Sequence, residues 1–223
     1  MKLSIVISVY QSYEIVRRQL LHLSKFPVEV IIVDDGSDPP IEGAAYRTGN
    51  QLAWTQGLGR NLGASKATGE YIFFTDIDHI ISKEAIEDAL SFTGNKMIFR
   101  RQIAVLDEQG NITQDRDVLK DWGYEKENLD ASVHGNTFVM KKSIFDELGG
   151  YEPKHSLIGY HPASRKGDDC FFNTKWNHKY REAPAHGRDI YMFPIGRFRK
   201  DGDLNPRGLF HNLSQSKQEA FNK

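Results

Sequence analysis

Residues 28–38, VEVIIVDDGSD, are the stretch that decides the fold. The aliphatic run at residues 30–33 predicts a strand buried on both faces, and a Gly-Ser turn after two aspartates ends it. A similar run, LSIVISV, occupies residues 3–9, and residues 11–26 between them carry apolar side chains at helical spacing. A strand, a helix and a second strand in this order predict a βαβ unit and therefore a parallel sheet.

The same alternation continues along the chain. The later strands are expected at residues 51–55, 70–75, 96–106, 135–141 and 188–195. Helices are expected from about Arg60, at 82–92 with Ser82 as the N-cap, after residue 141 and from 168. Residues 107–111 predict a hairpin turn, and the polar stretch 115–130 predicts a loop. The fold class predicted is α/β, one domain over residues 1–223 with a mostly parallel central sheet flanked by helices.

Composition excludes several classes of protein. The 223-residue chain has a net charge of -1, which gives no overall field toward nucleic acid, so no nucleic-acid partner is predicted. A single cysteine, Cys170, fits a reducing compartment, and no stretch approaches the ~20 apolar residues of a membrane span. A cytoplasmic location is therefore expected, while peripheral association with a membrane stays open. No oligomeric state is predicted.

Three of the predicted strands end in polar residues. These strand ends are Ser8-Val9-Tyr10, Asp34-Asp35-Gly36-Ser37 and Asp76-Ile77-Asp78. Ligands of open parallel sheets bind outside the carboxyl ends of the strands, so all three ends are expected to line one crevice.

Asp76 and Asp78 follow the buried run YIFFT at residues 71–75. In an extended strand two residues of alternate position point to the same side. Buried carboxylates need a positive partner, and two oxygen ligands on one side suit Mn²⁺ or Mg²⁺ held together with substrate phosphates. The alternative is a pair of turn aspartates that cap the next helix.

Several motifs in order carry a family resemblance. IVISVYQS, VEVIIVDDGSD, GLGRNLGASKATGEYIFFTDIDH, GNTFVMKKSIFDELGGYEP and GDDCFF resemble the successive motifs of family 2-type glycosyltransferases with a GT-A fold, over roughly residues 3–175. The C-terminal half also resembles the β-1,4-galactosyltransferase type, in which a GG-ED turn opens a helix.

The resemblance implies roles at the matching positions. Asp35 would hydrogen-bond the nucleotide base, typically uracil, and Asp76 would lie on the ribose side. Contacts to the nucleoside or to its loop are implied for Ser8, Val9, Tyr10, Arg60 and Asn61. Asp78 would bind the Mn²⁺ or Mg²⁺ ion that bridges the diphosphate, because a nucleoside diphosphate leaving group needs charge compensation. A late histidine is implied as third metal ligand, with His211 favoured and His186 as its competitor.

The acceptor side centres on Asp168 and Asp169 at the start of a predicted helix. The resemblance makes Asp169 the general base that takes the proton of the acceptor hydroxyl, and one base with direct displacement implies inversion. Asp168 is assigned to acceptor binding, with helix N-capping as an equal alternative. Trp122 is a candidate platform for the acceptor sugar, although large aromatic residues more often belong to the core.

The sequence thus predicts a metal-dependent inverting glycosyltransferase that moves a sugar from a UDP-sugar to a glycan hydroxyl, in surface polysaccharide synthesis. Residues 1–115 would bind the nucleotide sugar, and residues 116–223 would supply the acceptor site and the base. A nucleotidyltransferase is one alternative, but VYQSYE at residues 9–14 is not the Gly-rich basic phosphate loop it would need. A non-catalytic nucleotide-sugar-binding protein is the other, and the presence of both Asp78 and Asp169 argues against it.

Overall fold

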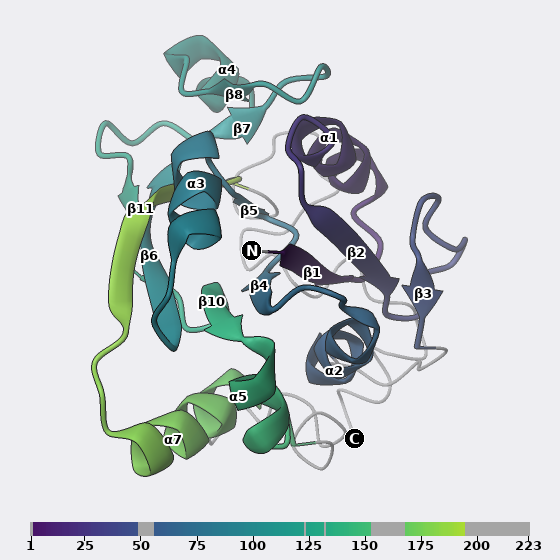
Figure 1. Ribbon diagram of the computed structural model, residues 1–223. Coiled ribbons are helices and arrows are strands. Elements are labelled where there is room, and N and C mark those ends of the chain that lie inside the picture. The colour runs from purple at the N-terminus through teal and green to yellow at the C-terminus, as the bar shows by residue number, and fades with distance from the viewer. Residues whose placement is uncertain (1, 49–55, 123, 132, 153–167, 195–223) are drawn as a thin grey trace, which may run out of the picture.

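The computed structural model describes residues 2–48, 56–122, 124–131, 133–152 and 168–194. Its central feature is a sheet of nine described strands in the order β3-β2-β1-β4-β10-β6-β11-β5, with β9 paired to β6 (Figure 1). These strands are β1 Leu3–Val9, β2 Glu29–Asp34, β3 Tyr46–Arg47, β4 Tyr71–Thr75, β5 His79–Ile80, β6 Lys96–Ile103, β9 Asp130–Ala131, β10 Phe138–Lys141 and β11 Ala185–Met192. A separate hairpin consists of β7 Val105–Leu106 and β8 Ile112–Thr113.

The sheet is parallel in its N-terminal part and mixed beyond it. β3, β2, β1 and β4 run parallel, as the predicted βαβ units require. β10 is inserted antiparallel between β4 and β6, β11 is parallel to β6, and β5 and β9 are antiparallel to their neighbours. The expected α/β sheet is therefore present, and the departure from a mostly parallel order comes from the strands that follow residue 78.

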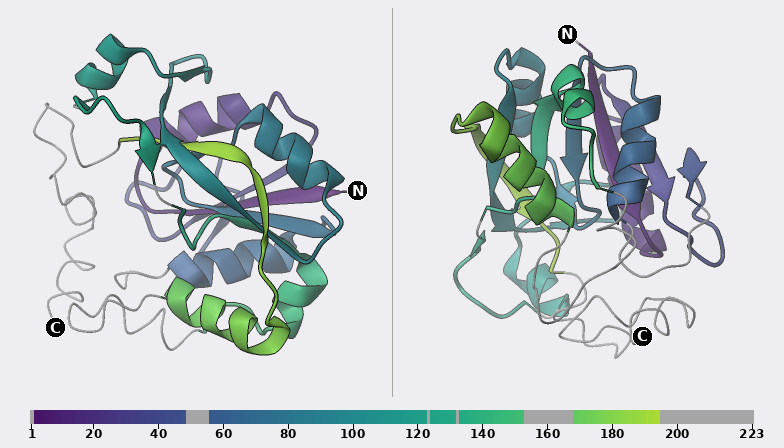
Figure 2. Two further views of the ribbon diagram at one scale, coloured as in Figure 1. Left: turned by 90° about the vertical axis from the view of Figure 1, so that its left-hand side faces the viewer. Right: turned by 90° about the horizontal axis from the view of Figure 1, so that it is seen from below.

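Helices cover both faces of the sheet. α1 Tyr13–Leu23 and α3 Lys83–Ser91 lie on one face, and α2 Gln56–Lys66, α5 Lys142–Glu147 and α7 Asp168–Tyr180 lie on the other (Figure 2). Alternate residues of the strands feed the two layers: Ile5 and Phe73 pack with α1 and α3, whereas Val6 and Phe74 pack with α2, α5 and α7. Each buried strand therefore needs apolar side chains at consecutive positions, which explains the continuous aliphatic runs.

A smaller apolar cluster lies under α4 Arg116–Asp121 and the β7–β8 hairpin. The prediction of a loop over residues 115–130 is wrong at α4. Asp115 caps this helix, because its Oδ1 accepts the amide hydrogens of Asp117 and Val118 at 2.9 and 3.0 Å. The hairpin turn predicted at residues 107–111 is confirmed between β7 and β8.

Two further expectations concern the ends of elements. Ser82 caps α3 as predicted, since the amide of Ala85 donates to its Oγ at 3.0 Å. The strand predicted at residues 51–55 lies outside the described residues.

The division of one domain at residue 115 stays a prediction, although one core cluster joins Phe74 from the first half to Phe145 and Phe172 from the second. Within the described ranges, no helix has both the length and the apolar character to cross a membrane.

The α2 helix approaches β1 closely because glycines form its inner face. A Cβ atom on Gly63 would lie 2.4 Å from Val6 Cγ1, and one on Gly59 would lie 2.1 Å from Ser8 Oγ. Both distances are below any normal van der Waals contact, and Val6 and Ser8 are buried. Glycine at these positions therefore sets the depth at which α2 docks on the sheet.

We expect Gly63→Ala to lower the free energy of unfolding by roughly 1–3 kcal/mol, the usual cost of overpacking a core. Chemical denaturation measures this change. The control is Ser65→Ala, an exposed position on the same helix. Helix propensity alone would raise the free energy of unfolding of Gly63→Ala by about 1 kcal/mol, and such an increase would contradict the close docking of α2.

Lys96, at the start of β6, is a buried cation beneath α7. Only 4% of the residue is exposed, and burial lowers the pKa of its amine to about 8. Nζ donates to Asn173 Oδ1 at 2.6 Å and lies over the rings of Phe138 and Trp176 at 4.8 and 5.3 Å. These contacts offset part of the desolvation that a buried ammonium suffers.

Lys96→Met should therefore change how stability depends on pH. The folded pKa of about 8 lies below the ordinary 10.5, so the unfolded chain binds more protons between these values and wild-type stability rises with pH there. The free energy of unfolding of the variant minus that of wild type should therefore fall by up to about 3 kcal/mol as the pH rises from 7 to 10.5. Denaturation series at several pH values measure it, with exposed Lys83→Met as control; a stability difference independent of pH would refute the prediction.

Candidate active site

The ends of β1, β2 and β4 meet at one edge of the sheet, as the sequence predicted. β1 pairs in parallel register with both other strands, with Val9 opposite Asp34 and Ile7 opposite Thr75. The chain beyond β4 departs from the expected extended strand. Asp76 opens a tight turn into β5, because its carbonyl accepts the amide of His79 at 3.0 Å. Turn geometry, and not strand parity, therefore places the two carboxylates.

Asp76 is paired with a buried arginine. Arg60 of α2 is 1% exposed and its guanidinium contacts Asp76 Oδ1, while Asp76 Oδ2 lies 3.4 Å from His134 Nδ1. Burial on its own would raise the pKa of Asp76, but the positive charge of Arg60, with smaller contributions from His79, His134 and Arg101, lowers it. Asp76 is therefore held as a carboxylate.

Asp78 has the opposite character. Burial and, next, the charge of Asp76 raise the pKa of its carboxyl group to about 6. Its backbone carbonyl accepts the amide of Phe193 at 2.7 Å, which fixes the turn to the chain after β11. A cation beside Asp78 would relieve both the desolvation and the repulsion that raise this pKa.

His79 is the buried centre of the site and is fully engaged. Nε2 accepts a hydrogen bond from Arg101 Nη1 at 2.8 Å, and Nδ1 contacts the hydroxyl of Thr137. Arginine only donates, so the proton of the neutral ring lies on Nδ1 and is donated to Thr137. Burial lowers the pKa of His79 to about 4, which agrees with a neutral ring. Gln19 donates to the His79 carbonyl at 2.8 Å.

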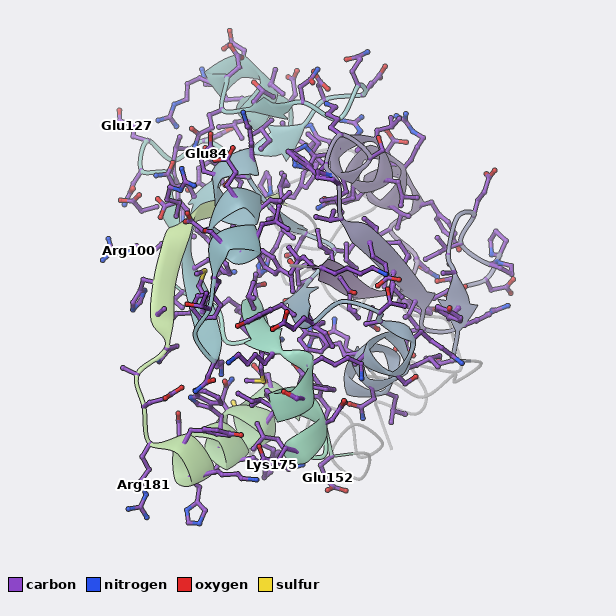
Figure 3. The ribbon with its side chains drawn as sticks, in the orientation of Figure 1. Glu84, Arg100, Glu127, Glu152, Lys175 and Arg181 are labelled. Carbon is purple, nitrogen blue, oxygen red and sulfur yellow. The ribbon has the colours of Figure 1, made fainter. Side chains whose placement is uncertain are left out.

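Arg101 reaches this centre because neighbouring residues of β6 face opposite sides. Arg100 points outward at the periphery of the molecule, as do the labelled Glu127 and Arg181 (Figure 3). Arg101 is only 8% exposed and turns inward to His79. Two buried arginines, from α2 and β6, therefore flank the acidic turn.

On the β2 side, Asp34 and Asp35 have different roles. Asp34 Oδ1 accepts the amide of Ser37 at 2.8 Å and Oδ2 accepts that of Ile41 at 3.2 Å, so it shapes the loop. Asp35 is buried at the strand end, where its amide donates to the Val9 carbonyl at 2.7 Å and its Oδ1 accepts from Thr48 Oγ1 at 2.9 Å.

The remaining positions expected to meet a nucleotide differ in exposure. Ser8 and Val9 are buried: Ser8 Oγ faces α2 without a hydrogen-bond partner, and the Val9 side chain belongs to the core cluster under α1. Tyr10 is half-buried at the strand end. The amide of Asn61 is engaged at both ends with the backbone of Tyr151, at 2.8 and 2.9 Å, so it anchors the chain after α5.

Residues 134–137, named here the His134 segment, join the acidic turn to α7. His134 faces Asp76, and Thr137 contacts His79. The Gly135 carbonyl accepts from Asn173 Nδ2 at 3.3 Å, and a Cβ atom on Gly135 would lie 3.7 Å from Asp169 Oδ2. The His134 segment thus lies between the acidic turn of Asp76 and Asp78 and the N-terminal turn of α7, which bears the predicted base Asp169.

Not every predicted site residue is brought to this place. Asp168 opens α7, and its side chain lies outside the described part, as does His211. Trp122 packs against Phe193, with ring centroids 5.2 Å apart, and its ring carries the Arg18 guanidinium at 5.5 Å. Its role in acceptor binding stays a prediction. Trp176 is 1% exposed and is a core residue.

The structure places His186, the competing candidate for third metal ligand, away from the acidic turn. It is exposed near the start of β11, opposite Ile98, whereas Met192 at the other end of the strand pairs with His79. Six residues of strand separate the two ends by roughly 20 Å. His134 is a histidine that the sequence analysis did not single out, and its local signal is its place directly before the GNTFVM motif.

Arg60→Met should lower the free energy of unfolding by roughly 3–5 kcal/mol, because it leaves the Asp76 carboxylate buried without its partner. Adding Asp76→Asn should recover part of the loss. Denaturation of both variants tests this, with Arg17→Met, which breaks an exposed pair with Glu14, as the control. Equal stability of Arg60→Met and Arg17→Met would show that the buried pair does not stabilise the fold.

Comparisons with known proteins agree with this arrangement. Residues 4–163 match the family described as "Glycosyltransferase like family 2". Over 107 residues the chain is 34% identical to the poly(ribitol-phosphate) beta-N-acetylglucosaminyltransferase TarS of Staphylococcus aureus strain Mu50. The matched region covers 41% of this chain and 19% of TarS. The chain therefore spans about a fifth of the length of this curated relative.

Two solved structures share the fold at low identity. The crystal structure of S. aureus TarS 1-349 has a TM-score of 0.52 and 16% identity, over 86% of this chain and 60% of that one. Glucosyl-3-phosphoglycerate synthase from Mycobacterium tuberculosis, in complex with Mn²⁺ and UDP-glucose, has a TM-score of 0.51 and 12% identity, over 86% and 69% of the two chains. At these identities the likeness describes the fold alone.

Proposed function

Because this chain belongs to glycosyltransferase family 2, we propose that it transfers a sugar from a UDP-sugar to a hydroxyl group of a glycan acceptor. The GT-A fold expected from the sequence is confirmed, whereas the resemblance to the β-1,4-galactosyltransferase type is not. One observation carries the proposal: the His134 segment joins the Asp76–Asp78 turn to the helix that bears Asp169. A leaving-group site and a proton acceptor are thereby neighbours.

The nucleotide would bind at the ends of β1 and β2. Asp35 is fixed by Val9 and Thr48, so its carboxylate is preorganised to accept a hydrogen bond from a uracil base. Tyr10, at the same strand end, would lie against the nucleoside. Ser8, Val9 and Asn61 are buried or engaged within the protein, and we assign them the support of this surface.

A divalent cation fits the acidic turn. Asp78 and Asp76 provide carboxylate oxygens, the ligands that Mn²⁺ and Mg²⁺ prefer, and the raised pKa of Asp78 marks an uncompensated negative charge that a cation would stabilise. When bound, the cation offsets the charge that develops on the diphosphate as it leaves. The structure of a relative with Mn²⁺ and UDP-glucose supports this pairing of metal and donor.

Asp169 would act as the general base. Its carboxylate takes the proton of the acceptor hydroxyl while that oxygen bonds to the anomeric carbon and the bond from this carbon to the diphosphate breaks. A single displacement from the opposite face inverts the anomeric configuration. We keep the roles predicted for Asp168 and Trp122 as acceptor residues and for His211 as a metal ligand as part of this proposal.

The acceptor class is inferred from a curated relative. TarS is named as a poly(ribitol-phosphate) beta-N-acetylglucosaminyltransferase, which supports a polymer as the acceptor, and we propose a surface polysaccharide. The nucleotidyltransferase alternative would require a nucleoside triphosphate or pyrophosphate and no glycan. A binding protein would release no UDP. Release of UDP from a UDP-sugar only when a glycan acceptor is present therefore separates the three functions.

We expect UDP to bind more tightly with Mn²⁺ than without it, and Asp78→Asn to abolish this dependence. Asp169→Asn should leave the Mn²⁺-dependent binding intact while transfer falls by roughly 10²–10⁴-fold, the usual contribution of a general base. Titration calorimetry and an assay of released UDP measure the two effects, with exposed Asp146→Asn as control. Metal-independent UDP binding, or full transfer by Asp169→Asn, would refute the respective assignment.

A further inference from the structure

We propose that His134 is a direct ligand of the divalent cation, through Nδ1, together with the carboxylates of the acidic turn. This inference rests on the proposed function and adds a ligand that the sequence motifs do not indicate. The nearby groups of the described chain that can hold a metal are Asp76, His79 and His134, whose ligand atoms all lie within 4.8 Å of one another.

The distance between His134 Nδ1 and Asp76 Oδ2 suits two ligands of one ion. The atoms are 3.4 Å apart. Two neighbouring ligands of an octahedral Mg²⁺-sized ion, each about 2.1 Å from it, lie about 3.0 Å apart. A shift of a few tenths of an ångström would therefore bring both atoms onto a common cation. Asp76 Oδ1 is already bound by Arg60, which leaves Oδ2 as the oxygen that faces the metal.

The hydrogen bonds select His134 over His79. Both ring nitrogens of His79 are engaged, Nε2 by Arg101 and Nδ1 by Thr137. Binding a cation at His79 would require the guanidinium to leave. In His134, Nδ1 accepts a long hydrogen bond from the amide of Asn136, at 3.4 Å, which a cation at Nδ1 would replace without moving a charged group. Two acceptor atoms, Nδ1 and Asp76 Oδ2, thus face each other, which is the arrangement a cation stabilises.

Exposure also favours His134. Its side chain is 38% exposed and that of Asp76 is 13% exposed, whereas His79 is 1% exposed. An ion arriving from solvent can reach His134 and Asp76 without displacing the core. The T-shaped contact between the two imidazoles, with centroids 5.3 Å apart, holds the His134 ring against the wall formed by His79.

The surrounding charges indicate that the cation arrives with the diphosphate. Arg60 pairs with Asp76, and the buried Arg101 guanidinium lies beside His79, so the site already holds two positive charges to which a bare divalent ion would add. A neutral imidazole adds affinity without adding charge, and the negative diphosphate supplies the balance. Imidazole nitrogen also favours a transition-metal ion over Mg²⁺, whose preferred ligands are oxygens. We therefore infer Mn²⁺ as the preferred ion.

The test is the nitrogen signal of bound Mn²⁺ in the full chain with UDP. Electron spin echo spectroscopy of the wild-type Mn²⁺–UDP complex should show coupling to an imidazole ¹⁴N, and this coupling should be absent in His134→Gln. Mn²⁺ affinity in the presence of UDP should fall at least about tenfold, since even outer partners of a ligand contribute that much. The ratio of Mn²⁺ to Mg²⁺ affinity should fall with it. His186→Gln, at the exposed far end of β11, is the matched control.

His134→Asn keeps an oxygen near the position of Nδ1, so it should still bind Mn²⁺ while losing the ¹⁴N coupling. This result would show that the coupling is lost with the imidazole and not because the site fails to fold. Persistence of the coupling in both His134 variants would identify another imidazole, such as that of His211, and overturn the inference. Absence of the coupling in wild type would overturn it too. Mn²⁺-dependent UDP binding in wild type decides the proposed function separately, because it does not depend on which side chain binds the ion.

Discussion

The buried ion pair between Arg60 and Asp76 is the interaction on which the site depends. It joins α2 to the end of β4. The glycine face of α2 holds this helix close to β1, the neighbour of β4 in the sheet. A carboxylate at the end of an apolar strand is costly to desolvate, and the guanidinium offsets this cost within the protein itself. The turn can therefore hold its shape before any ligand arrives.

The pairing of Asp76 with Arg60 also determines the electrostatic environment of Asp78. Since Arg60 satisfies the first carboxylate, the second faces burial and a neighbouring negative charge without an equal partner, which is why its pKa rises. The His134 segment connects the turn to α7, because His134 lies beside Asp76 and the Gly135 carbonyl accepts from Asn173. In the proposed function, the donor and acceptor sites therefore lie on separate elements that share one short connection.

The sequence predicted what depends on local pattern. The parallel strands β1, β2 and β4 were readable because strands covered on both faces need consecutive apolar residues, and the Ser82 cap because its partners are close in the chain. The antiparallel direction of β10 was not readable, because a fully buried run of four residues has the same composition in either direction. α4 was missed because it is short and mostly polar.

At the site, the acidic positions followed from their place after a strand, but their partners did not. Arg60 lies in a motif whose resemblance implied a nucleotide contact, and the structure pairs it with Asp76. His134 and Thr137 gain their importance from contacts with residues 58 positions away, which no window of sequence contains. His186 was weighed because of its order in the chain, whereas its distance from the turn is set by the length of β11.

The insertion of β10 beside β4 also bears on how the chain reaches its final state during synthesis. β1, β2 and β4 lie within the first 75 residues and can associate early, but the outer edge of β4 waits for β10, which begins at residue 138. Until then an apolar strand edge with unpaired amides and carbonyls is available to other chains. The chain after residue 130 also supplies the His134 segment and then α7, so protection of this edge from aggregation and completion of the proposed site both depend on the later part of synthesis.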